Sequence, residues 1–173
     1  MELRKSSKSD IESIMKIIHQ AQNYFKKKGI DQWQNNYPNE DTILADINNK
    51  IGYVLVKDNS IVGTAAISFD KERTYDFIYE GNWISNDKYA VIHRIAIDNE
   101  YKGLGLSSLI LKSVEEMCKN KNIMSIKIDT HEENLSMQKF LKKNGFKYCG
   151  VIYLEDRSKR IAFEKILYYW INS

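Results

Sequence analysis

Residues 101–108, Tyr-Lys-Gly-Leu-Gly-Leu-Ser-Ser, form a glycine-bearing turn between two segments of different periodicity. The preceding segment, Tyr89–Ile97, is an apolar, β-branched run typical of a buried strand. The following segment, Leu106–Asn120, places its apolar residues at helical spacing. A strand that enters a helix through such a turn leaves backbone N–H groups at the helix N-terminus without intrahelical partners, and the helix dipole adds positive charge there. The turn therefore predicts an anion site, for which phosphate is the usual ligand.

Length and composition narrow the class of protein. The chain has 173 residues and a formal net charge of +3, so we expect one domain over residues 1–173 and no nucleic-acid partner. It has no apolar run long enough to span a membrane, and the polar segment Met1–Asp10 lacks the apolar core of a signal peptide. Cys118 and Cys149 make no disulfide framework, which favours a cytoplasmic location. No histidine and cysteine cluster has metal-ligand spacing, so we expect no metal.

Hydrophobic periodicity predicts the strands and the fold class. The predicted strands are Met1–Lys5, Gly52–Lys57, Ile61–Phe69, Tyr89–Ile97, Ile123–Thr130, Lys147–Leu154 and Ile161–Leu167. Two of them flank the turn-forming residues 58–60 and read as a β-hairpin. The order of the elements predicts an α/β protein of the α+β type. It would have a mixed, mostly antiparallel central sheet of about six or seven strands, with helices on both faces.

Capping residues mark the predicted helices. A first helix follows Asp10 as its N-cap and ends near Lys28, before Gly29. A second, shorter helix follows Asn39. The last two are Leu106–Asn120 and Leu135–Asn144, the latter capped by Asn134 and ended by Gly145. We expect Lys71–Lys88, which alternates polar and aromatic residues, to be a loop.

Three features of the sequence together resemble the GNAT superfamily of N-acetyltransferases. The pyrophosphate loop of that family reads Arg/Gln-x-x-Gly-x-Gly/Ala, and Lys102, Gly105 and Ser107 fall on its three defined positions. Lysine keeps a hydrogen-bond donor but lacks the planar fork of arginine, and serine is small enough for close backbone approach. The second family signature, an asparagine near a helix start followed by a Gly-Phe pair, is matched by Asn134 and by residues 145–146.

The resemblance implies a binding mode for acetyl-CoA. Family members hold this cofactor where the strand at Tyr89–Ile97 splays from the strand at Ile123–Thr130. The amides of the pantetheine arm would pair with the backbone of the first strand as an added strand does, and the pyrophosphate would meet N–H groups of the turn. The predicted cofactor contacts are Ile95, Ala96, Ile97, Lys102, Gly103, Leu104, Gly105, Leu106, Ser107, Ser108, Asn134, Met137 and Lys143.

The resemblance also implies a reaction, in which a primary amine of an unidentified acceptor attacks the thioester directly. His93 is the candidate base, because histidine titrates near neutral pH and strand alternation places it on the face of Ile95 and Ile97. A structural histidine is the alternative. Many family members have a tyrosine as the acid for the leaving thiol at the position where this chain has Leu141. Another tyrosine or water could supply the proton instead, or the thiolate could leave unaided. Tyr148 and Tyr153, on the next predicted strand, are the candidate tyrosines, and a core role is the alternative for both.

The candidate acceptor-binding residues lie in two predicted loops. Trp33 and Tyr37 lie between the first two helices, and Glu80 and Trp83 lie in the segment Lys71–Lys88. Aromatic walls with a carboxylate would suit an amine cation. The alternative is that the tryptophans pack beneath their loops as satellite clusters.

Two other classes of protein remain as alternatives. A non-catalytic acyl-CoA-binding module is motivated by Leu141. A dinucleotide-binding protein is suggested by Gly103-x-Gly105-x-x-Ser108, which imitates the Rossmann fingerprint, although only one βαβ unit is visible and the motif lies in the middle of the chain. The expected partner is a small-molecule or peptide amine, with no nucleic acid and no membrane, and the sequence leaves a homodimer undecided.

Overall fold

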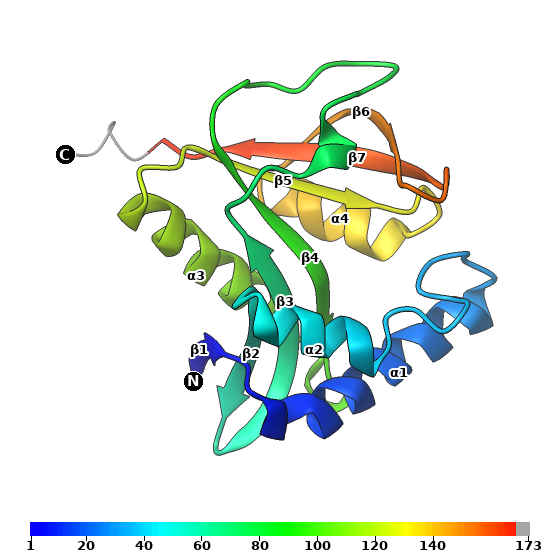
Figure 1. Ribbon diagram of the computed structural model, residues 1–173, viewed down its shortest axis with the longest axis vertical. Helices are drawn as coiled ribbons and strands as arrows, with labels where there is room; N and C mark the ends of the chain where they lie inside the picture. The colour runs from blue at the N-terminus through cyan, green and yellow to red at the C-terminus, as the bar shows by residue number, and fades with distance from the viewer. Residues whose placement is uncertain (169–173) are drawn as a thin grey trace. The chain divides into compact units, whose positions relative to one another are not determined.

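A computed structural model describes residues 1–168 and contains, within them, a seven-stranded mixed sheet in the order β1-β2-β3-β4-β5-β7-β6 (Figure 1). The strands are β1 (Glu2–Lys5), β2 (Gly52–Lys57), β3 (Ser60–Ser68), β4 (Tyr89–Ile97), β5 (Ser125–Thr130), β6 (Lys147–Tyr153) and β7 (Lys159–Ile166). The helices are α1 (Ile11–Lys28), α2 (Glu40–Asn48), α3 (Leu106–Asn120) and α4 (Leu135–Lys143). The predicted α+β class with a mixed sheet is confirmed.

The chain divides into two compact units, which are described separately. The first unit comprises Met1–Ile67 and Ile92–Val114, and the second comprises Ser68–Val91 and Glu115–Ser173. The division passes through both β4 and α3. A single domain over residues 1–173 stays a prediction, and its end at residues 169–173 lies outside the described residues.

The first unit begins with an antiparallel ladder in which β1 pairs with β2 and β2 with β3. The β2–β3 connection turns at Asp58 and Asn59, whose φ angles are +48° and +63°. Two consecutive left-handed residues match the right-handed twist of the flanking strands, and aspartate and asparagine tolerate that conformation. The predicted hairpin is therefore confirmed, with β3 starting at Ser60.

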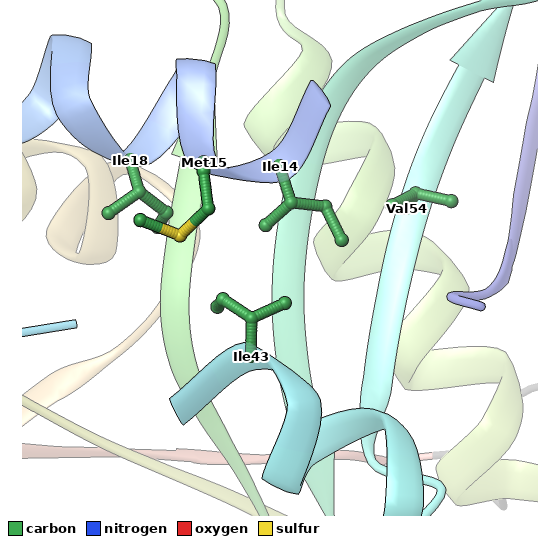
Figure 2. Packing of buried hydrophobic residues seen from close by; sticks show 5 residues of the cluster. All are labelled: Ile14, Met15, Ile18, Ile43 and Val54. Carbon is green, nitrogen blue, oxygen red and sulfur yellow. The ribbon is translucent and has the colours of Figure 1, made fainter. Parts of the chain in front are cut away.

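One face of this ladder packs against α1 and α2. The buried cluster there consists of Ile14, Met15, Ile18, Ile43 and Val54, and Figure 2 shows the side chains of the two helices converging with that of β2. The residues from α1 recur at the spacing of one helical face, so burying them places the helix flat on the strands.

The other face of the same strands meets the beginning of α3. Leu55 follows Val54 on β2, so it points the opposite way, and its cross-strand partner is Gly63. A Cβ atom at Gly63 would lie 2.8 Å from Cδ1 of Ile97 and 3.4 Å from Cδ1 of Ile110. A larger residue at this position would therefore require the Ile97 side chain to move, so glycine suits the close packing of β3 against β4 and α3. Helices cover both faces of the strands in this unit, as predicted.

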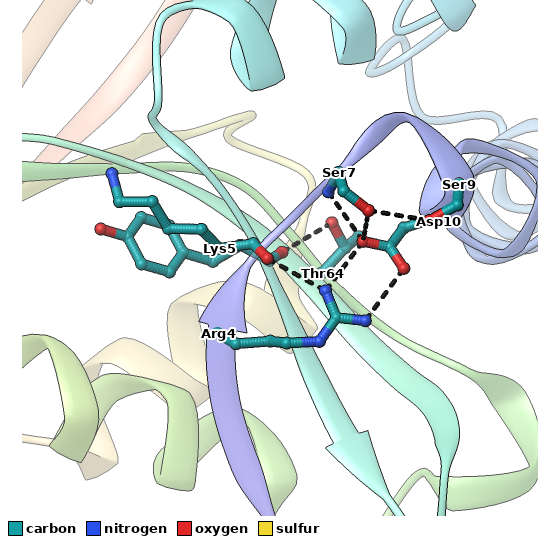
Figure 3. Close-up of polar contacts among 7 residues, drawn as sticks. Arg4, Lys5, Ser7, Ser9, Asp10 and Thr64 are labelled. Carbon is teal, nitrogen blue, oxygen red and sulfur yellow. Dashed lines mark hydrogen bonds and ion pairs between the residues drawn. The ribbon is translucent and has the colours of Figure 1, made fainter.

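Asp10 is the N-cap residue of α1, as predicted, but its side chain makes no capping hydrogen bond to that helix. A 3₁₀ turn over Lys8–Asp10 already gives this residue helical backbone angles. Its carboxylate instead accepts from both Nη atoms of Arg4, at 2.8 and 2.9 Å, and from Ser7 N–H at 2.7 Å (Figure 3). The hydrogen bond from Arg4 lowers the pKa of Asp10 to about 2. The side chain of Asp10 thus joins β1 to the first helical turn.

The second unit is built on β4, β5, β7 and β6. The parallel β4–β5 pairing runs from Tyr89 opposite Ser125 to Val91 opposite Lys127, and the pairings of β7 with β5 and β6 are antiparallel. Its buried cluster joins residues from the connecting loop and three strands, namely Tyr75, Val91, Ile152 and Ala162. Strand β5 starts at Ser125 rather than at the predicted Ile123, and the other predicted element ends differ by at most two residues.

The segment Lys71–Lys88 is a loop, as predicted, with one 3₁₀ turn and one bridge to a strand. Tyr79 N–H donates to the carbonyl oxygen of Val151 at 2.8 Å, and Val151 N–H donates back at 2.7 Å. A Cβ atom on Gly150 would lie 2.5 Å from the Tyr79 carbonyl oxygen. A glycine is therefore required where this loop approaches β6.

Candidate active site

The entry turn of α3, residues 101–105, has the backbone that the glycine pattern predicts. Gly103 and Gly105 have φ angles of +81° and +76°, a region that side-chain-bearing residues rarely adopt. A Cβ atom on either glycine would meet nothing within 4 Å, so both face open space. Leu109 N–H donates to the Gly105 carbonyl oxygen at 3.1 Å, and the amides of residues 106–108 precede this first bond of the helical series.

Side chains of α1 form hydrogen bonds with the residues that immediately precede the entry turn. Asp98 is buried and accepts from Glu100 N–H at 3.0 Å, from Lys16 Nζ at 3.3 Å and from Gln20 Nε2 at 3.4 Å. Gln20 Oε1 accepts in turn from Asn99 N–H at 2.8 Å. Burial alone would raise the pKa of Asp98, but these hydrogen bonds outweigh it and lower that pKa. The backbone leading into the turn is thereby fixed from the side of α1.

Lys102, the predicted hydrogen-bond donor to phosphate, lies in the entry turn but contacts α1 at Tyr24, one helical turn beyond Gln20. Its Nζ atom is 5.4 Å from the ring centroid of Tyr24, a distance that permits a cation–π contact. Tyr24 follows Gln20 by four residues, so both side chains project from one stripe of the helix. The sequence reasoning did not find this stripe, although its spacing was readable once α1 had been assigned.

The predicted cofactor strand is interrupted at one residue. Ile97 is buried, Ile95 and Ala96 are half-buried, and Arg94 has a φ angle of +52°. The alternation that places His93 on the face of Ile95 therefore crosses a residue that is not extended. His93 is half-buried in β4, and its position on the cofactor face stays a prediction.

Arg94 forms a two-pronged ion pair that sequence reasoning missed. Its Nε and Nη2 atoms donate to the two carboxylate oxygens of Asp46 in α2, at 2.8 and 2.6 Å, and its Nη1 atom donates to the Tyr37 hydroxyl at 3.0 Å. The two charged side chains are 14% and 9% exposed. Burial alone would lower the pKa of Arg94, but its hydrogen bonds and electrostatic interactions with Asp46 and Tyr37 together outweigh burial and raise that pKa. A lone arginine in an apolar strand was the available signal, because a buried charge requires a partner.

The loop between α1 and α2 holds the first two acceptor candidates. Trp33 packs against the α1–α2 cluster, with its ring edge-on to that of Phe25 at a centroid distance of 5.6 Å. This is the packing role that the alternative reading predicted. Tyr37 is 46% exposed, and its hydroxyl accepts the hydrogen bond from Arg94. A contact of either residue with an acceptor stays a prediction.

In the second unit, the predicted cofactor residues lie on α4. Asn134 is buried and its side-chain oxygen accepts from Met137 N–H at 3.1 Å, so the predicted N-cap is confirmed. Met137 is half-buried, and Lys143 is exposed at the last residue of the helix. Their contacts with a cofactor stay predictions.

The two tyrosines proposed as acids lie on β6 and are not core residues. Tyr148 is 50% exposed and packs edge-on against Phe163, with a centroid distance of 5.9 Å. Tyr153 is 44% exposed and meets the ring of Tyr79 at 5.5 Å. The alternative reading of buried core tyrosines is wrong for both, and a role as acid stays a prediction.

The other two candidate acceptor-binding residues, Trp83 and Glu80, differ in burial. Trp83 is half-buried, and its Nε1 atom donates to the carbonyl oxygen of Tyr75 at 2.9 Å. Its ring also lies 5.1 Å from that of Tyr75, so it packs beneath its loop as the alternative reading predicted. Glu80 is exposed and has a φ angle of +56°. Acceptor binding by either residue stays a prediction.

A buried lysine lies beside Trp83. Lys127 of β5 is 3% exposed, with its Nζ atom 4.3 Å from the ring centroids of both Trp83 and Tyr89, and it donates to the Ser85 carbonyl oxygen at 3.3 Å. Burial lowers the pKa of Lys127. Alternation along β5 indicated one apolar face but gave no sign that the loop would cover the other.

Glu164, opposite Lys127 in the β5–β7 register, is also buried. Its carboxylate accepts from Ile84 N–H at 2.6 Å, from the Ser85 hydroxyl at 2.8 Å and from the Ser125 hydroxyl at 2.6 Å. Neutral donors therefore satisfy this carboxylate and fasten the loop to the sheet of the second unit.

The cysteines show no sign of activation. Burial raises the pKa of the Cys118 thiol to about 12 and also raises the pKa of Cys149. Both are therefore neutral, buried groups at physiological pH. Within residues 1–168, no group of His, Cys, Asp and Glu side chains is arranged to hold a metal ion. No helix in this part of the chain is long and apolar enough to cross a membrane.

Comparison with known proteins gives matches of different extent. The sequence matches the acetyltransferase (GNAT) family over residues 15–146. The structure resembles that of a GNAT-family acetyltransferase from Streptococcus agalactiae, with 35% identity, a TM-score of 0.88, and coverage of 96% of this chain and 95% of that one. It also resembles the PaiA N-acetyltransferase of Thermoplasma acidophilum in complex with coenzyme A, with 19% identity, a TM-score of 0.69, and coverage of 95% and 98%.

A curated relative matches over a shorter length. The "Putative [ribosomal protein bS18]-alanine N-acetyltransferase" of Bacillus subtilis is 34% identical over 73 residues, which are 42% of this chain and 48% of that protein. The match thus spans about half the length of this relative. Together, the matches confirm the predicted resemblance and the predicted fold.

Proposed function

This chain belongs to the GNAT acetyltransferase family, and we propose that it transfers an acetyl group from acetyl-CoA to a primary amine. The observation that carries the proposal is the entry turn of α3. Its two left-handed glycines face open space at the point where the helix begins, which suits close approach of a diphosphate to backbone N–H groups. A cytoplasmic location, a single domain over residues 1–173 and an amine-bearing small molecule or peptide as partner belong to the same proposal.

Cofactor binding in the first unit would use mainly the backbone. The amides of Gly103–Ser108 would cradle the pyrophosphate, with Lys102 adding a positive charge that can leave its place over the Tyr24 ring. The backbone of Ile95–Ile97 would pair with the pantetheine amides as an added strand does. Asn134, Met137 and Lys143 are the contacts proposed for the second unit.

In the proposed reaction, the amine nitrogen attacks the thioester carbonyl, a C–N bond forms and the C–S bond breaks. His93 takes the proton that the amine must lose, and the thiolate of coenzyme A takes up a proton from Tyr148, Tyr153 or water. Leu141 is fully buried and has no proton to give. Positioning the two reactants would supply most of the acceleration.

Calorimetric titration with acetyl-CoA tests the site through two matched glycine variants. Gly105→Val should abolish binding, because the added side chain occupies the space that the diphosphate needs. Gly29→Val is the control. Gly29 has a similar φ angle of +69° and equally open surroundings, but it ends α1. Equal affinity of Gly105→Val and wild type would overturn the cofactor assignment.

His93→Ala should lower turnover about 10²-fold and leave the affinity for acetyl-CoA unchanged, because a general base contributes about that much to catalysis. The ascending limb of the pH–rate profile should disappear with it. His19→Ala, on the exposed side of α1, is the control and should keep the wild-type profile. A wild-type profile in His93→Ala would remove the proposed base.

An acyl-CoA-binding module without activity is the second candidate, favoured by the apolar Leu141. Release of free thiol from acetyl-CoA separates the two, when measured over a panel of amines. The panel should contain a peptide with an N-terminal alanine, because of the Bacillus subtilis relative, together with polyamines and lysine peptides. Tight binding without thiol release for any amine would favour the binding module.

A further inference from the structure

Arg94 has a backbone conformation that its position does not explain. It lies inside β4, yet its φ angle is +52°, and non-glycine residues adopt this region rarely and only where their surroundings enforce it. Its neighbours along the chain are His93 and Ile95, the proposed base and the first residue of the proposed pantetheine ladder. A change of the backbone angles at Arg94 would therefore change the orientation of His93 relative to Ile95.

The side chain of Arg94 supplies the enforcement. Two of its nitrogen atoms engage the two carboxylate oxygens of Asp46, which fixes the plane of the guanidinium as well as its distance. Asp46 is itself held, because its backbone oxygen accepts from Ile51 N–H at 2.9 Å just beyond the end of α2. The strand is thereby linked, through the Asp46 side chain, to the C-terminal part of α2.

A third contact brings in the loop between α1 and α2. The remaining guanidinium nitrogen donates to the hydroxyl of Tyr37, whose ring is half exposed. All three guanidinium nitrogens of Arg94 thus donate, two of them to Asp46 and one to Tyr37. One arginine therefore connects the cofactor strand, α2 and the candidate acceptor loop.

Stability alone is a poor reason for such a pair. An apolar pair of similar volume usually stabilises a protein as well as a buried ion pair does, because the two charges must first lose their hydration. What an apolar pair cannot do is fix the orientation of a strand residue through two parallel hydrogen bonds. The geometry of the Arg94–Asp46 pair is thus its distinguishing property.

We propose that Arg94 is a positioning residue of the acetyltransferase site. Its pairing with Asp46 holds the His93–Ile95 backbone in one arrangement for catalysis, and its hydrogen bond to Tyr37 sets the acceptor loop against the same strand. The inference rests on the proposed function for its kinetic consequences, but not for its structural ones.

The test uses a double variant, so that no buried charge is left unpaired. Asp46→Leu/Arg94→Met removes both charges, and the matched control Asp10→Leu/Arg4→Met removes the other bidentate pair of the same unit. With the best amine of the panel, kcat should fall about 10²-fold in the first double variant, the loss expected from misplacement of reacting groups, and should stay at the wild-type value in the control. A wild-type kcat in both would overturn the proposal.

Two further variants separate the parts of the proposal. Arg94→Lys keeps the positive charge but lacks the planar guanidinium, so its kcat should be as low as that of the double variant. Wild-type kcat in Arg94→Lys would show that the charge alone suffices. Tyr37→Phe should raise the KM for the acceptor several-fold and leave the dissociation constant of acetyl-CoA unchanged. An unaltered KM would remove Tyr37 from the proposal.

A spectroscopic readout keeps the test independent of turnover. The ring ¹H–¹³C resonances of His93 in NMR spectra should move in Asp46→Leu/Arg94→Met and stay in place in the Asp10→Leu/Arg4→Met control. If the wild type acetylates no amine, the proposed function fails while a moved His93 resonance still supports positioning by Arg94. An unmoved resonance would overturn the positioning role, whatever the turnover.

Discussion

Arg94 in the first unit and Lys127 in the second are cations on strands with little exposed surface, 14% for the Arg94 side chain and 3% for Lys127, but the protein satisfies them in different ways. Arg94 is held by a carboxylate through two directed hydrogen bonds. Lys127 lies over two aromatic rings and donates to one backbone carbonyl, and its neighbour Glu164 is satisfied by neutral donors. The first arrangement fixes orientation, whereas the second tolerates rotation of a compact ammonium group.

This difference in contacts indicates different structural roles for Arg94 and Lys127. A planar fork on a paired carboxylate specifies where the backbone of β4 stands. The ammonium group of Lys127, which lies over aromatic rings, only helps to hold the loop containing Trp83 and Ser85 over β5. We therefore expect the two sites to respond differently when a single side chain is removed.

Asp46→Leu should have the largest effect on stability, a loss of about 3–5 kcal/mol, because it removes the carboxylate from a largely enclosed guanidinium and leaves Arg94 only its hydrogen bond to Tyr37. Urea unfolding followed by circular dichroism measures it. Adding Arg94→Met should recover much of the loss, since the double variant contains no isolated charge. A single variant as stable as wild type would mean that water reaches Arg94.

Lys127→Met should have a smaller effect, a loss of about 1–2 kcal/mol, made up of cation–π contacts and one hydrogen bond. Methionine fills similar space, and Glu164 keeps its neutral donors. Unfolding under the same conditions gives the comparison. A loss as large as that of Asp46→Leu would show that Lys127 and Glu164 act as a tight ion pair, and the contrast between the two sites would disappear.

Asp10→Asn should have the smallest effect, about 0.5–1 kcal/mol at neutral pH, because Arg4 in this pair is 38% exposed. The same fork geometry is thus compared at two depths of burial. The folded-state pKa of Asp10 is about 2 and lies below its ordinary value of 3.8. Its contribution is therefore fully present above the ordinary pKa and is lost as the pH falls towards 2.

The pH dependence supplies its own control. Wild-type stability, measured by urea unfolding from pH 5 down to pH 2, should approach that of Asp10→Asn as the carboxyl becomes protonated. Parallel curves over this range would contradict the assigned hydrogen bond between Arg4 and Asp10.

The sequence predicted most where local signals and tertiary packing agree. Both β4 and α3 begin and end at the predicted residues, because an apolar β-branched run and a helical stripe are separated by two glycines that tolerate left-handed angles. Asn134 was found as a cap because asparagine is favoured at that position and a helical pattern follows it.

The failures involve side-chain contacts that no helical or strand periodicity in the sequence indicates. Aspartate is a residue type favoured as a helix cap, but the carboxylate of Asp10 accepts hydrogen bonds from Arg4 instead. No pattern in the sequence indicates that β1 places Arg4 beside Asp10. Arg94 and Asp46 are separated by 48 positions, and the left-handed angle of Arg94 arises in a residue type that does not favour it. Lys127 lies against Trp83 and Ser85 of the loop as well as Tyr89 of β4, and no pattern in the sequence indicates that this loop reaches it.

The bridge between Tyr79 and Val151 has a consequence for self-association. Strand β6 is an edge strand of the sheet. An edge strand with unpaired amide and carbonyl groups can pair with a strand of another chain and so promote aggregation. At Val151 both of these groups are already bound within the chain. A homodimer that forms in solution would therefore not continue the sheet past this residue, and a bulkier residue at Gly150, by displacing Tyr79, would open that edge to aggregation.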